Sequence, residues 1–479
     1  MTDNKRDFGS FHASNVQGTI SLSEEEYSPP KIPIDLPAFK ETENDKFEFG
    51  KKCKKSHFYL EEDCTFINHG AFGGVLKEAM ETAQKWQIYT ERQPLRFFDR
   101  ELIPHLVHIS RRLAKFVCCF NRELIPHLVH ISRRLAKFVG CDPSDLVLVT
   151  NATTAINTVV KGTSLQKGDT VYMLSTTYGA VKKLLKWQCE LTGAVLQEET
   201  VTFPVTGNQQ ILELVRKSLK KGTKLAVFDH IPSNTPFILP IKELVDICQE
   251  KNVPVLIDGA HGLGALDLDL KMLDPDYYIS NAHKWFCAPK GCAFMYVKKD
   301  LQSKTRPLVI SHGFGSGFNS EFIWAGLHDY SPFLALHTVI DFWELVGPSK
   351  IRQYMYGLCK KACHLLVKKW GTSLAAPEEM FLMVRKVKGK GSCMALVEIP
   401  PDVYKNTTKI EYSNAESLQN QLYHQFNIEV PIKCVDGVLY VRISCHIYND
   451  LSDYDKLGEA VIRIKNGQSD SKKQKLNCE

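Results

Sequence analysis

The sequence contains no apolar stretch of the roughly 20 residues that a membrane-spanning helix requires. Its first residues, MTDNKRDFGSFHASNVQ, carry acidic side chains and have no apolar core, so they do not predict a secretory signal. The fifteen cysteines are odd in number and show no paired C-x-x-C spacing of the kind that binds metals. We therefore expect a cytoplasmic protein with reduced thiols, without a metal site and without contact to a membrane.

A dense basic stripe with interleaved aromatic residues is also missing, although 60 basic residues outnumber 54 acidic ones. Such stripes are typical of proteins that bind nucleic acids, so no nucleic-acid partner is predicted. The most basic run, SDSKKQKLNCE, belongs to residues 467–479, which we expect to be a solvated tail. With 44% apolar and 24% charged residues, the chain has the composition of an ordinary globular protein.

The 479 residues are too many for one small core, which indicates a large domain and a smaller one. Residues 1–50 are polar and rich in Ser, Pro and Glu, so we expect a flexible extension there. A large α/β domain is expected over residues 51–345. Beyond it, a long amphipathic stretch and apolar runs such as CMALVEIP and GVLYVRIS indicate a small α+β domain over residues 346–466.

Short apolar runs alternate with amphipathic stretches between residues 145 and 300, as in DTVYMLS followed by GAVKKLLKWQCELTG. This alternation predicts a mostly parallel sheet with helices on both faces. Ligands of such sheets bind at the carboxyl ends of the strands. Polar clusters follow the predicted strands, and five turns could therefore converge on one crevice: 151–154, 175–178, 229–233, 258–261 and 281–284.

Residues 98–141 contain a tandem duplication, in which FDRELIPHLVHISRRLAKFVCC is followed by FNRELIPHLVHISRRLAKFVGC. The two copies differ only at Asp99/Asn121 and Cys118/Gly140. One continuous helix through both would measure roughly 65 Å, and Pro126 would interrupt it. We expect one copy to take the position of a core helix and the other to bulge out. A recent exon duplication or an error in the gene sequence explains the repeat most simply.

Lys284 lies between two apolar runs in YYISNAHKWFCAPKGCAFMYV, where a charged amine would be costly to bury. An amine at a strand end can instead form a Schiff base with pyridoxal phosphate, which also requires an acidic partner at its ring nitrogen. Asp258, in VLIDGAH, suits that partner. Tyr178 could stack on the ring, and His261 could reach its phenolic oxygen.

A cofactor phosphate would need hydrogen-bond donors near the N-terminus of a helix. The stretch NATTAIN supplies the backbone N–H groups of Ala152 and Thr153, the Thr153 hydroxyl and the positive end of the helix dipole.

These stretches also carry a resemblance to a known family. The chain resembles the class V aminotransferase family of fold-type I pyridoxal-phosphate enzymes, in particular its isopenicillin N epimerase-like and cysteine desulfhydrase-like branch. The matching motifs occur in family order over about residues 60–460: FINHGAFGG, NATTAIN, TTYGA, VLIDGAHGLG, NAHKW, WAGLHDYSPFLAL and VRISCHIYND.

The resemblance implies a covalent Schiff base between Lys284 and pyridoxal phosphate, with Asp258 at the pyridine nitrogen and His261 at the phenolic oxygen. It also implies that Tyr178 stacks on the ring and that Ser233 lies near the phenolic oxygen. Three residues would hold the phosphate: Thr153, Asn281 and His283.

On the substrate side, the resemblance implies that Arg442 grips the carboxylate of an amino acid, while Asn68 and His69 line the pocket. It further implies a homodimer. The family commonly has Thr after Gly in the WAGLHDY stretch, where the hydroxyl reaches the cofactor phosphate of the neighbouring subunit. This chain has Leu327 there, so we expect that contact to be missing.

Simpler structural roles for these residues remain open at the level of sequence. Asp258 could cap a turn, and Arg442 could pair with an internal carboxylate. The other simpler roles are core packing of Tyr178, His261 and His283, a helix N-terminal role for Thr153, and a Gly-rich turn shaped by Asn68 and His69. Lysines are most often exposed, but the position of Lys284 within NAHKW, after VLIDGAH, argues against a surface lysine.

The reaction that we favour is carbon–sulfur bond cleavage of the cysteine desulfhydrase type, with epimerisation or transamination as the second choice. Sulfur transfer would need a cysteine on a mobile loop, and the nearest candidates are more simply explained as buried structural cysteines: Cys393, Cys434 and Cys445. A degenerate member that acts by binding alone is a third possibility. A hydrolase or metal enzyme that uses Asp229, His230 and His261 has the least support.

Overall fold

The computed structural model describes residues 34–37, 47–71, 73–92, 134–136, 138–323, 326, 328–381, 391–404 and 410–467. Most of the predicted N-terminal extension and C-terminal tail lies outside the described residues, as do Leu327 and the first copy of the duplication.

A seven-stranded sheet organises the larger part of the chain, with the strand order β2-β8-β7-β6-β5-β3-β4. Strands β3 to β7 run parallel to one another, whereas β8 runs antiparallel to both β7 and β2. The prediction of a mostly parallel α/β sheet is therefore confirmed. The strands are β2 (Leu146–Val149), β3 (Thr170–Leu174), β4 (Val195–Glu199), β5 (Leu225–Asp229), β6 (Val255–Asp258), β7 (Tyr277–Asn281) and β8 (Ala293–Val297).

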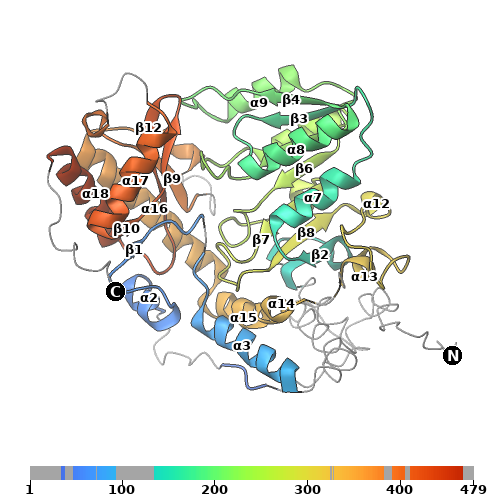
Figure 1. The fold of residues 1–479 in the computed structure, drawn as a ribbon, viewed down its shortest axis with the longest axis horizontal. Helices are drawn as coiled ribbons and strands as arrows, with labels where there is room; N and C mark the ends of the chain where they lie inside the picture. Colours follow the sequence, from blue (N-terminus) through green and yellow to red (C-terminus); the bar gives the residue numbers. More distant parts are fainter. Residues whose placement is uncertain are drawn as a thin grey trace.

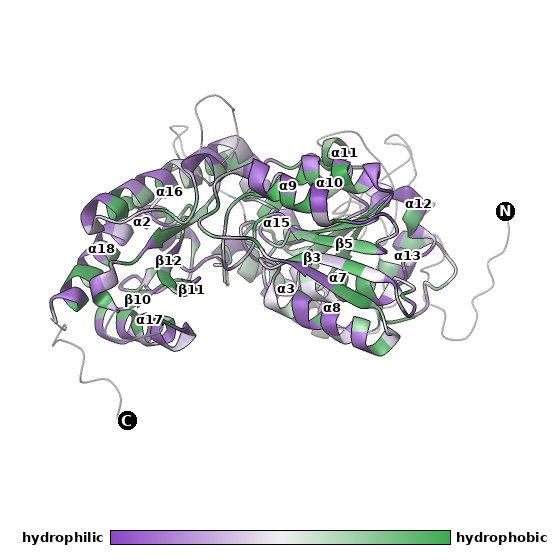
Figure 2. Cartoon of the chain, turned by 90° about the horizontal axis from the view of Figure 1, so that it is seen from above, coloured by the Kyte–Doolittle hydropathy of each residue, from purple (hydrophilic) through white to green (hydrophobic). Residues whose placement is uncertain are grey.

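Helices cover both faces of this sheet, as Figure 2 shows. Helices α7 (Ala152–Gly162) and α8 (Gly179–Thr192) lie on one face. The opposite face carries α9 (Asn208–Ser218), α10 (Ile241–Glu250) and α11 (Leu270–Leu273). The remaining helices of this part are α3 (Lys77–Arg92), α12 (Lys299–Gln302), α13 (Phe318–Ile323), α14 (Ser331–Leu334) and α15 (Leu336–Val346).

The central strands are apolar along their whole length because both faces are covered. All five residues of β5 are buried, with Val227 in the apolar cluster that includes Ile156 of α7. Its neighbour Phe228 points to the other face and joins the cluster that includes Leu244 of α10. The helices on the two faces thus leave the ends of the strands as the place for polar side chains.

A smaller antiparallel sheet with the order β11-β12-β9 forms the second part of the molecule. Its strands are β9 (Met394–Glu398), β11 (Ile432–Val435) and β12 (Val438–Ser444). The helices of this part are α2 (Lys51–His57), α16 (Pro348–Trp370), α17 (Tyr412–Phe426) and α18 (Leu451–Lys465). Short 3₁₀ turns occur along the chain at Pro143–Asp145, Glu378–Met380 and Pro401–Val403. None of the helices in the described ranges is long and apolar enough to cross a membrane.

The N-terminal segment of the described chain crosses to the smaller part. Strand β1 (Thr65–Phe66) pairs in parallel with β10 (Ile428–Glu429), so residues 65–71 lie beside the C-terminal strands. Figure 1 shows this blue segment and α2 next to the orange and red elements of the small sheet.

The described part of the second copy of the duplication belongs to the core. Leu135, Ala136 and Val139 are fully buried, and Arg134 forms ion pairs with Asp341 and Glu344 of α15. One copy therefore occupies a core position, as expected, while the other copy lies outside the described residues.

Candidate functional site

A cavity of about 460 Å³ opens at the carboxyl ends of the parallel strands and extends to the small sheet. It is lined by every site residue predicted from the sequence except His69: Asn68, Ala152, Thr153, Tyr178, Ser233, Asp258, His261, Asn281, His283, Lys284 and Arg442. The five polar turns thus contribute to one cavity, because parallel strands bring their carboxyl ends to the same edge of the sheet.

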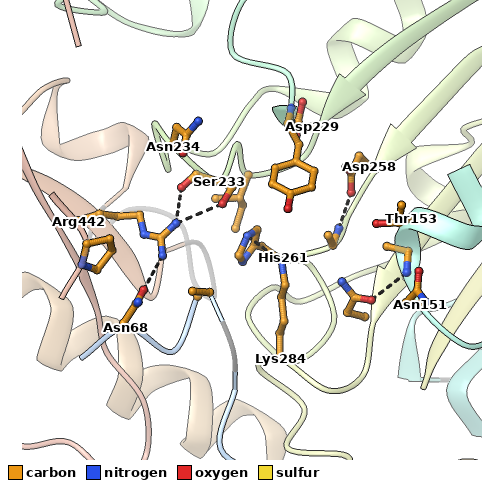
Figure 3. A pocket seen from close by; sticks show the side chains of 18 of the residues that line it. Asn68, Asn151, Thr153, Asp229, Ser233, Asn234, Asp258, His261, Lys284 and Arg442 are labelled. Carbon is orange, nitrogen blue, oxygen red and sulfur yellow. Dashed lines mark hydrogen bonds between the residues drawn. The ribbon is translucent and has the colours of Figure 1, made fainter. Parts of the chain in front are cut away.

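Lys284 lies in the turn between β7 and β8, and its amine reaches into the middle of this cavity (Figure 3). Its Nζ lies 3.1 Å from Nε2 of His261. Burial lowers the pKa of Lys284 from 10.5 to about 8, an effect that the nearby Asp258 carboxylate partly offsets. The structure thus rules out an exposed lysine at this position.

The hydrogen bonds of His261 indicate which nitrogen of its ring carries the proton. The indole N–H of Trp285 donates to Nδ1 of His261 over 3.2 Å, and an indole nitrogen can only donate. Burial lowers the pKa of His261 well below its usual value, so the ring is neutral and carries its proton on Nε2. The His261 Nε2–H therefore points to the Lys284 amine and can donate to its deprotonated form, whose share is raised by the lowered pKa of Lys284.

Asp258 ends β6 and Asp229 ends β5, and the two residues are register partners. Oδ1 of Asp258 accepts from the Ala260 N–H at 2.9 Å, whereas Oδ1 of Asp229 accepts from the Tyr178 N–H at 3.3 Å. Burial raises the pKa of both carboxyl groups, and the Asp258 charge raises that of Asp229 further. Two adjacent carboxylates repel, so Asp229, whose pKa is raised further, binds a proton more readily than Asp258.

The N-terminus of α7 forms the far end of the cavity. Asn151 caps the helix by accepting from the Thr154 N–H at 2.8 Å, and Asn281 Oδ1 accepts from the Ala152 N–H at 2.9 Å. Within the described ranges, the backbone N–H and the hydroxyl of Thr153 have no hydrogen-bond partner. His283 stands nearby with Nδ1 placed 3.2 Å from the Cys292 carbonyl, and burial lowers its pKa to about 4.

Arg442, on β12, forms the opposite end of the cavity together with Asn68 and Ser233 (Figure 3). Its Nη1 donates to the Ser233 carbonyl at 2.6 Å, and its Nη2 donates to Oδ1 of Asn68 at 2.8 Å. The Asn68 amide nitrogen donates in turn to Glu429 at 3.0 Å. Arg442 is buried, yet the hydrogen bonds recorded for it go to neutral oxygens rather than to an internal carboxylate.

His69 lies behind the cavity wall rather than in it. Its Nε2 lies 2.8 Å from the Lys284 carbonyl, its Nδ1 lies 2.5 Å from the Tyr448 hydroxyl, and its ring stacks on His446 at 3.8 Å. The glycine-rich turn permits this close approach, since a Cβ on Gly73 would lie 2.5 Å from the Lys284 carbonyl oxygen. His69 therefore supports the backbone of Lys284 and does not line the substrate side.

The further residues of the cavity, which were not assigned a cofactor or substrate role from the sequence, include four with long polar or charged side chains: Asp229, Tyr412, Gln419 and Lys433. Asp229 follows an apolar strand and belongs to the predicted polar turn 229–233, so its position in the cavity could have been predicted from the sequence. The other three come from α17 and β11 of the small sheet. Only the packing of the second part of the molecule against the first brings them to the cavity.

None of the described cysteines lines the cavity. Cys393 and Cys445 are fully buried, and burial raises the pKa of both thiols. Cys434 is half-buried and lies 3.8 Å from the Ile410 carbonyl. His230 is turned away from the cavity, with Nδ1 placed 2.9 Å from the Tyr278 hydroxyl, so it does not form one set with Asp229 and His261.

Solved structures with this fold include pyridoxal-phosphate enzymes. A cystine C–S lyase, described in complex with cysteine persulfide, superposes with a TM-score of 0.64 at 18% identity, covering 84% of this chain and 98% of that one. A cysteine desulfurase from Thermococcus onnurineus gives a TM-score of 0.66 at 17% identity, with coverages of 88% and 99%.

Curated relatives extend the comparison to sequence. A probable chloroplastic L-cysteine desulfhydrase of Arabidopsis thaliana is 32% identical over 426 residues, covering 83% of this chain and 82% of the relative. An isopenicillin N epimerase of Streptomyces clavuligerus is 25% identical over 425 residues, with coverages of 85% and 96%. The family profile described as aminotransferase class-V matches residues 120–358, beginning where the second copy of the duplication begins. The chain therefore belongs to the class V aminotransferase family.

Proposed function

We propose that this protein is a pyridoxal-phosphate-dependent carbon–sulfur lyase that acts on cysteine or a cysteine derivative. The observation that carries the proposal is the position of the Lys284 amine, which lies in a cavity between the Asp258 carboxyl group and the Arg442 guanidinium and has a lowered pKa. The similarity to L-cysteine desulfhydrases supports the choice of reaction.

The residues of the cavity fit the cofactor. The unpartnered donors of Thr153 at the N-terminus of α7 suit a phosphate, with Ala152, Asn281 and His283 beside them. An ionised Asp258 suits a protonated pyridine nitrogen. A Lys284 amine with a lowered pKa suits an aldehyde, and the Nε2–H of His261 would then be free to donate to another oxygen. Tyr178 and Ser233 also line the cavity.

Pyridoxal phosphate, when bound, supplies a conjugated ring that withdraws electrons from the Cα of an amino acid. The chain's own residues prepare the substrate for that chemistry. Arg442 binds its carboxylate through a planar fork of N–H donors, and Asp258 keeps the ring nitrogen protonated. The Lys284 amine takes the Cα proton as a general base. With L-cysteine and one water, the overall products are hydrogen sulfide, pyruvate and ammonia.

The placement of the cysteines favours release of the sulfur over its transfer to the protein. A transferase needs a nucleophilic thiol beside the substrate, whereas the cavity is lined by no cysteine from the part of the chain that the structure describes. The buried thiols of Cys393 and Cys445 are poor nucleophiles because burial raises their pKa.

The proposal is tested by incubating the purified, cofactor-loaded protein with L-cysteine and measuring sulfide, pyruvate and ammonia. Equimolar formation of the three, absent in Lys284→Ala, is the expected result. Exchange of the Cα proton with solvent without sulfide release would indicate an epimerase, and conversion of the cofactor to its amine form would indicate an aminotransferase. Absence of a visible cofactor band after addition of pyridoxal phosphate would indicate a degenerate member that acts by binding alone.

We also propose a homodimer with a cytoplasmic location. An exposed apolar segment supports the dimer, because Leu308, Val309, Ile310 and Phe314 are 44% to 63% exposed and lie close together in sequence. Patches of this kind usually mark contact surfaces. The free thiols of the described cysteines support a reducing compartment, and fractionation of cells that express the tagged chain would test it.

A further inference from the structure

Two cationic side chains face the small-sheet end of the cavity, and the α-carboxylate of an amino acid requires only one of them. Arg442 has that role in the function proposed above. Lys433, on β11, lines the same end of the cavity. Its ammonium has neither a carboxylate nor a hydrogen-bond partner among the described residues.

The register of the small sheet places both cations on one face. Lys433 lies opposite Tyr440 in the antiparallel pair β11–β12, and Arg442 follows Tyr440 two positions along β12. Residues two positions apart point to the same face, and diagonal neighbours on that face are roughly 7–8 Å apart. This spacing suits two anionic groups of a single small molecule.

The described acidic residues do not neutralise Lys433. The two carboxyl groups in the cavity wall, Asp229 and Asp258, stand at the strand ends of the large sheet, on its cofactor side. Glu398 lies on β9, beyond β12, and accepts a hydrogen bond from the Ser373 hydroxyl at 2.8 Å.

Lys433 is half-buried in this environment, which is unfavourable for an unpaired ammonium. Burial, and to a smaller extent the Arg442 charge, lowers the pKa of Lys433 from 10.5 to about 8. An anion placed between the two cations would offset both the cost of burying the Lys433 ammonium and its repulsion by Arg442. Gln419 and Tyr412 line the same region and offer neutral polar groups around such an anion.

We infer that the substrate is an amino acid whose side chain ends in an anionic group, specifically a cysteine thioether with a carboxylate on its sulfur substituent. Arg442 binds the α-carboxylate of this substrate and Lys433 binds the second carboxylate. The inference rests on the proposed lyase function and narrows its substrate class. L-Cysteine fits the reaction but leaves Lys433 unpaired.

A matched pair of substrates tests the inference: S-carboxymethyl-L-cysteine and its neutral amide, S-carbamoylmethyl-L-cysteine. The wild-type protein should favour the acid in kcat/KM by about 10-fold or more, which is the range for a hydrogen-bonded charge. Lys433→Met should remove this preference by lowering kcat/KM for the acid and leaving kcat/KM for the amide unchanged. Lys433→Arg should retain the preference. Lys361→Met, on the exposed side of α16, is the control for loss of a lysine and should behave as wild type.

A binding measurement separates the inference from the lyase function. Glutarate and butyrate are titrated calorimetrically into the cofactor-loaded protein and into Lys433→Met. Tighter binding of glutarate that depends on Lys433 upholds the anion site even if no thioether is cleaved, in which case the lyase function fails. Cleavage of acid and amide with equal efficiency, together with equal binding of glutarate and butyrate, overturns the inference and leaves the lyase standing. An unchanged cofactor absorption band shows that Lys433→Met is folded.

Discussion

Asp229 and Asp258 are register partners at the ends of two neighbouring parallel strands, yet burial and the neighbouring charge raise the pKa of Asp229 more strongly than burial raises that of Asp258. Both carboxyl groups accept a backbone N–H, but the Lys284 charge lowers the pKa of Asp258, whereas the second oxygen of Asp229 is buried and has no hydrogen-bond partner among the described residues. A protonated Asp229 beside an ionised Asp258 lowers the repulsion between them. In the proposed function, Asp258 pairs with the cofactor nitrogen and Asp229 modifies the electrostatic environment of Asp258.

This difference predicts unequal effects of two isosteric substitutions. Asp258→Asn should reduce kcat/KM by about 100-fold or more, because the charge opposite the ring nitrogen is lost. Asp229→Asn should reduce it by less than about 10-fold, since a neutral amide oxygen can still accept from the Tyr178 N–H. Steady-state kinetics of both variants would check this order. A larger loss for Asp229→Asn would show that the charges are assigned the wrong way round.

The pKa of Lys284 predicts how pyridoxal phosphate binds covalently to the cofactor-free protein. Only the neutral amine reacts, and its pKa is lowered to about 8. The rate should therefore rise as the pH increases through about 8 and then level off, instead of rising up to the ordinary lysine pKa of 10.5. Stopped-flow absorption gives this profile, with Lys284→Arg as a control that should show no covalent band. A midpoint close to that ordinary value would contradict a buried, neutral amine.

Arg442 predicts a substitution that affects binding more than turnover. Arg442→Lys keeps a positive charge but loses the planar fork that contacts Asn68 and Ser233. KM for an amino-acid substrate should rise by about 10- to 100-fold, with a smaller change in kcat. Asn68→Ala should produce a weaker effect of the same kind, because it removes one orienting partner. An unchanged KM in Arg442→Lys would assign the substrate carboxylate to another residue.

The exposed apolar segment predicts a substitution that separates subunits. Ile310→Asp places a charge on a side chain that is 56% exposed, and it should convert the dimer to a monomer in size-exclusion chromatography with light scattering. Leu191→Asp, at a position on α8 that is 65% exposed, is the matched control and should leave the mass unchanged. A wild-type protein that is itself monomeric would refute the homodimer.

The sequence was most informative at positions where a chemically reactive side chain directly follows a predicted strand. Lys284 and Asp258 could be placed because each follows an apolar strand, and parallel strands bring such positions to one edge. Lys433 gave no signal, since its approach to the cavity depends on how the small sheet packs against the large one. His69 was expected to line the cavity, but its ring lies behind the cavity wall, where it stacks on His446. The sequence motif around His69 gives no information about this stacking partner, which is far away in the chain.

The contact between Asn68 and Arg442 joins residues that are 374 positions apart in the chain. Everything proposed to hold the cofactor lies between residues 152 and 284, and chains are synthesised from the N-terminus. The residues proposed to hold the cofactor are therefore all synthesised before the strand that carries Arg442. The arginine proposed to bind the amino-acid carboxylate is thus among the last residues of the cavity to be added to the chain, and the pocket can bind its substrate only after nearly the whole sequence has been made.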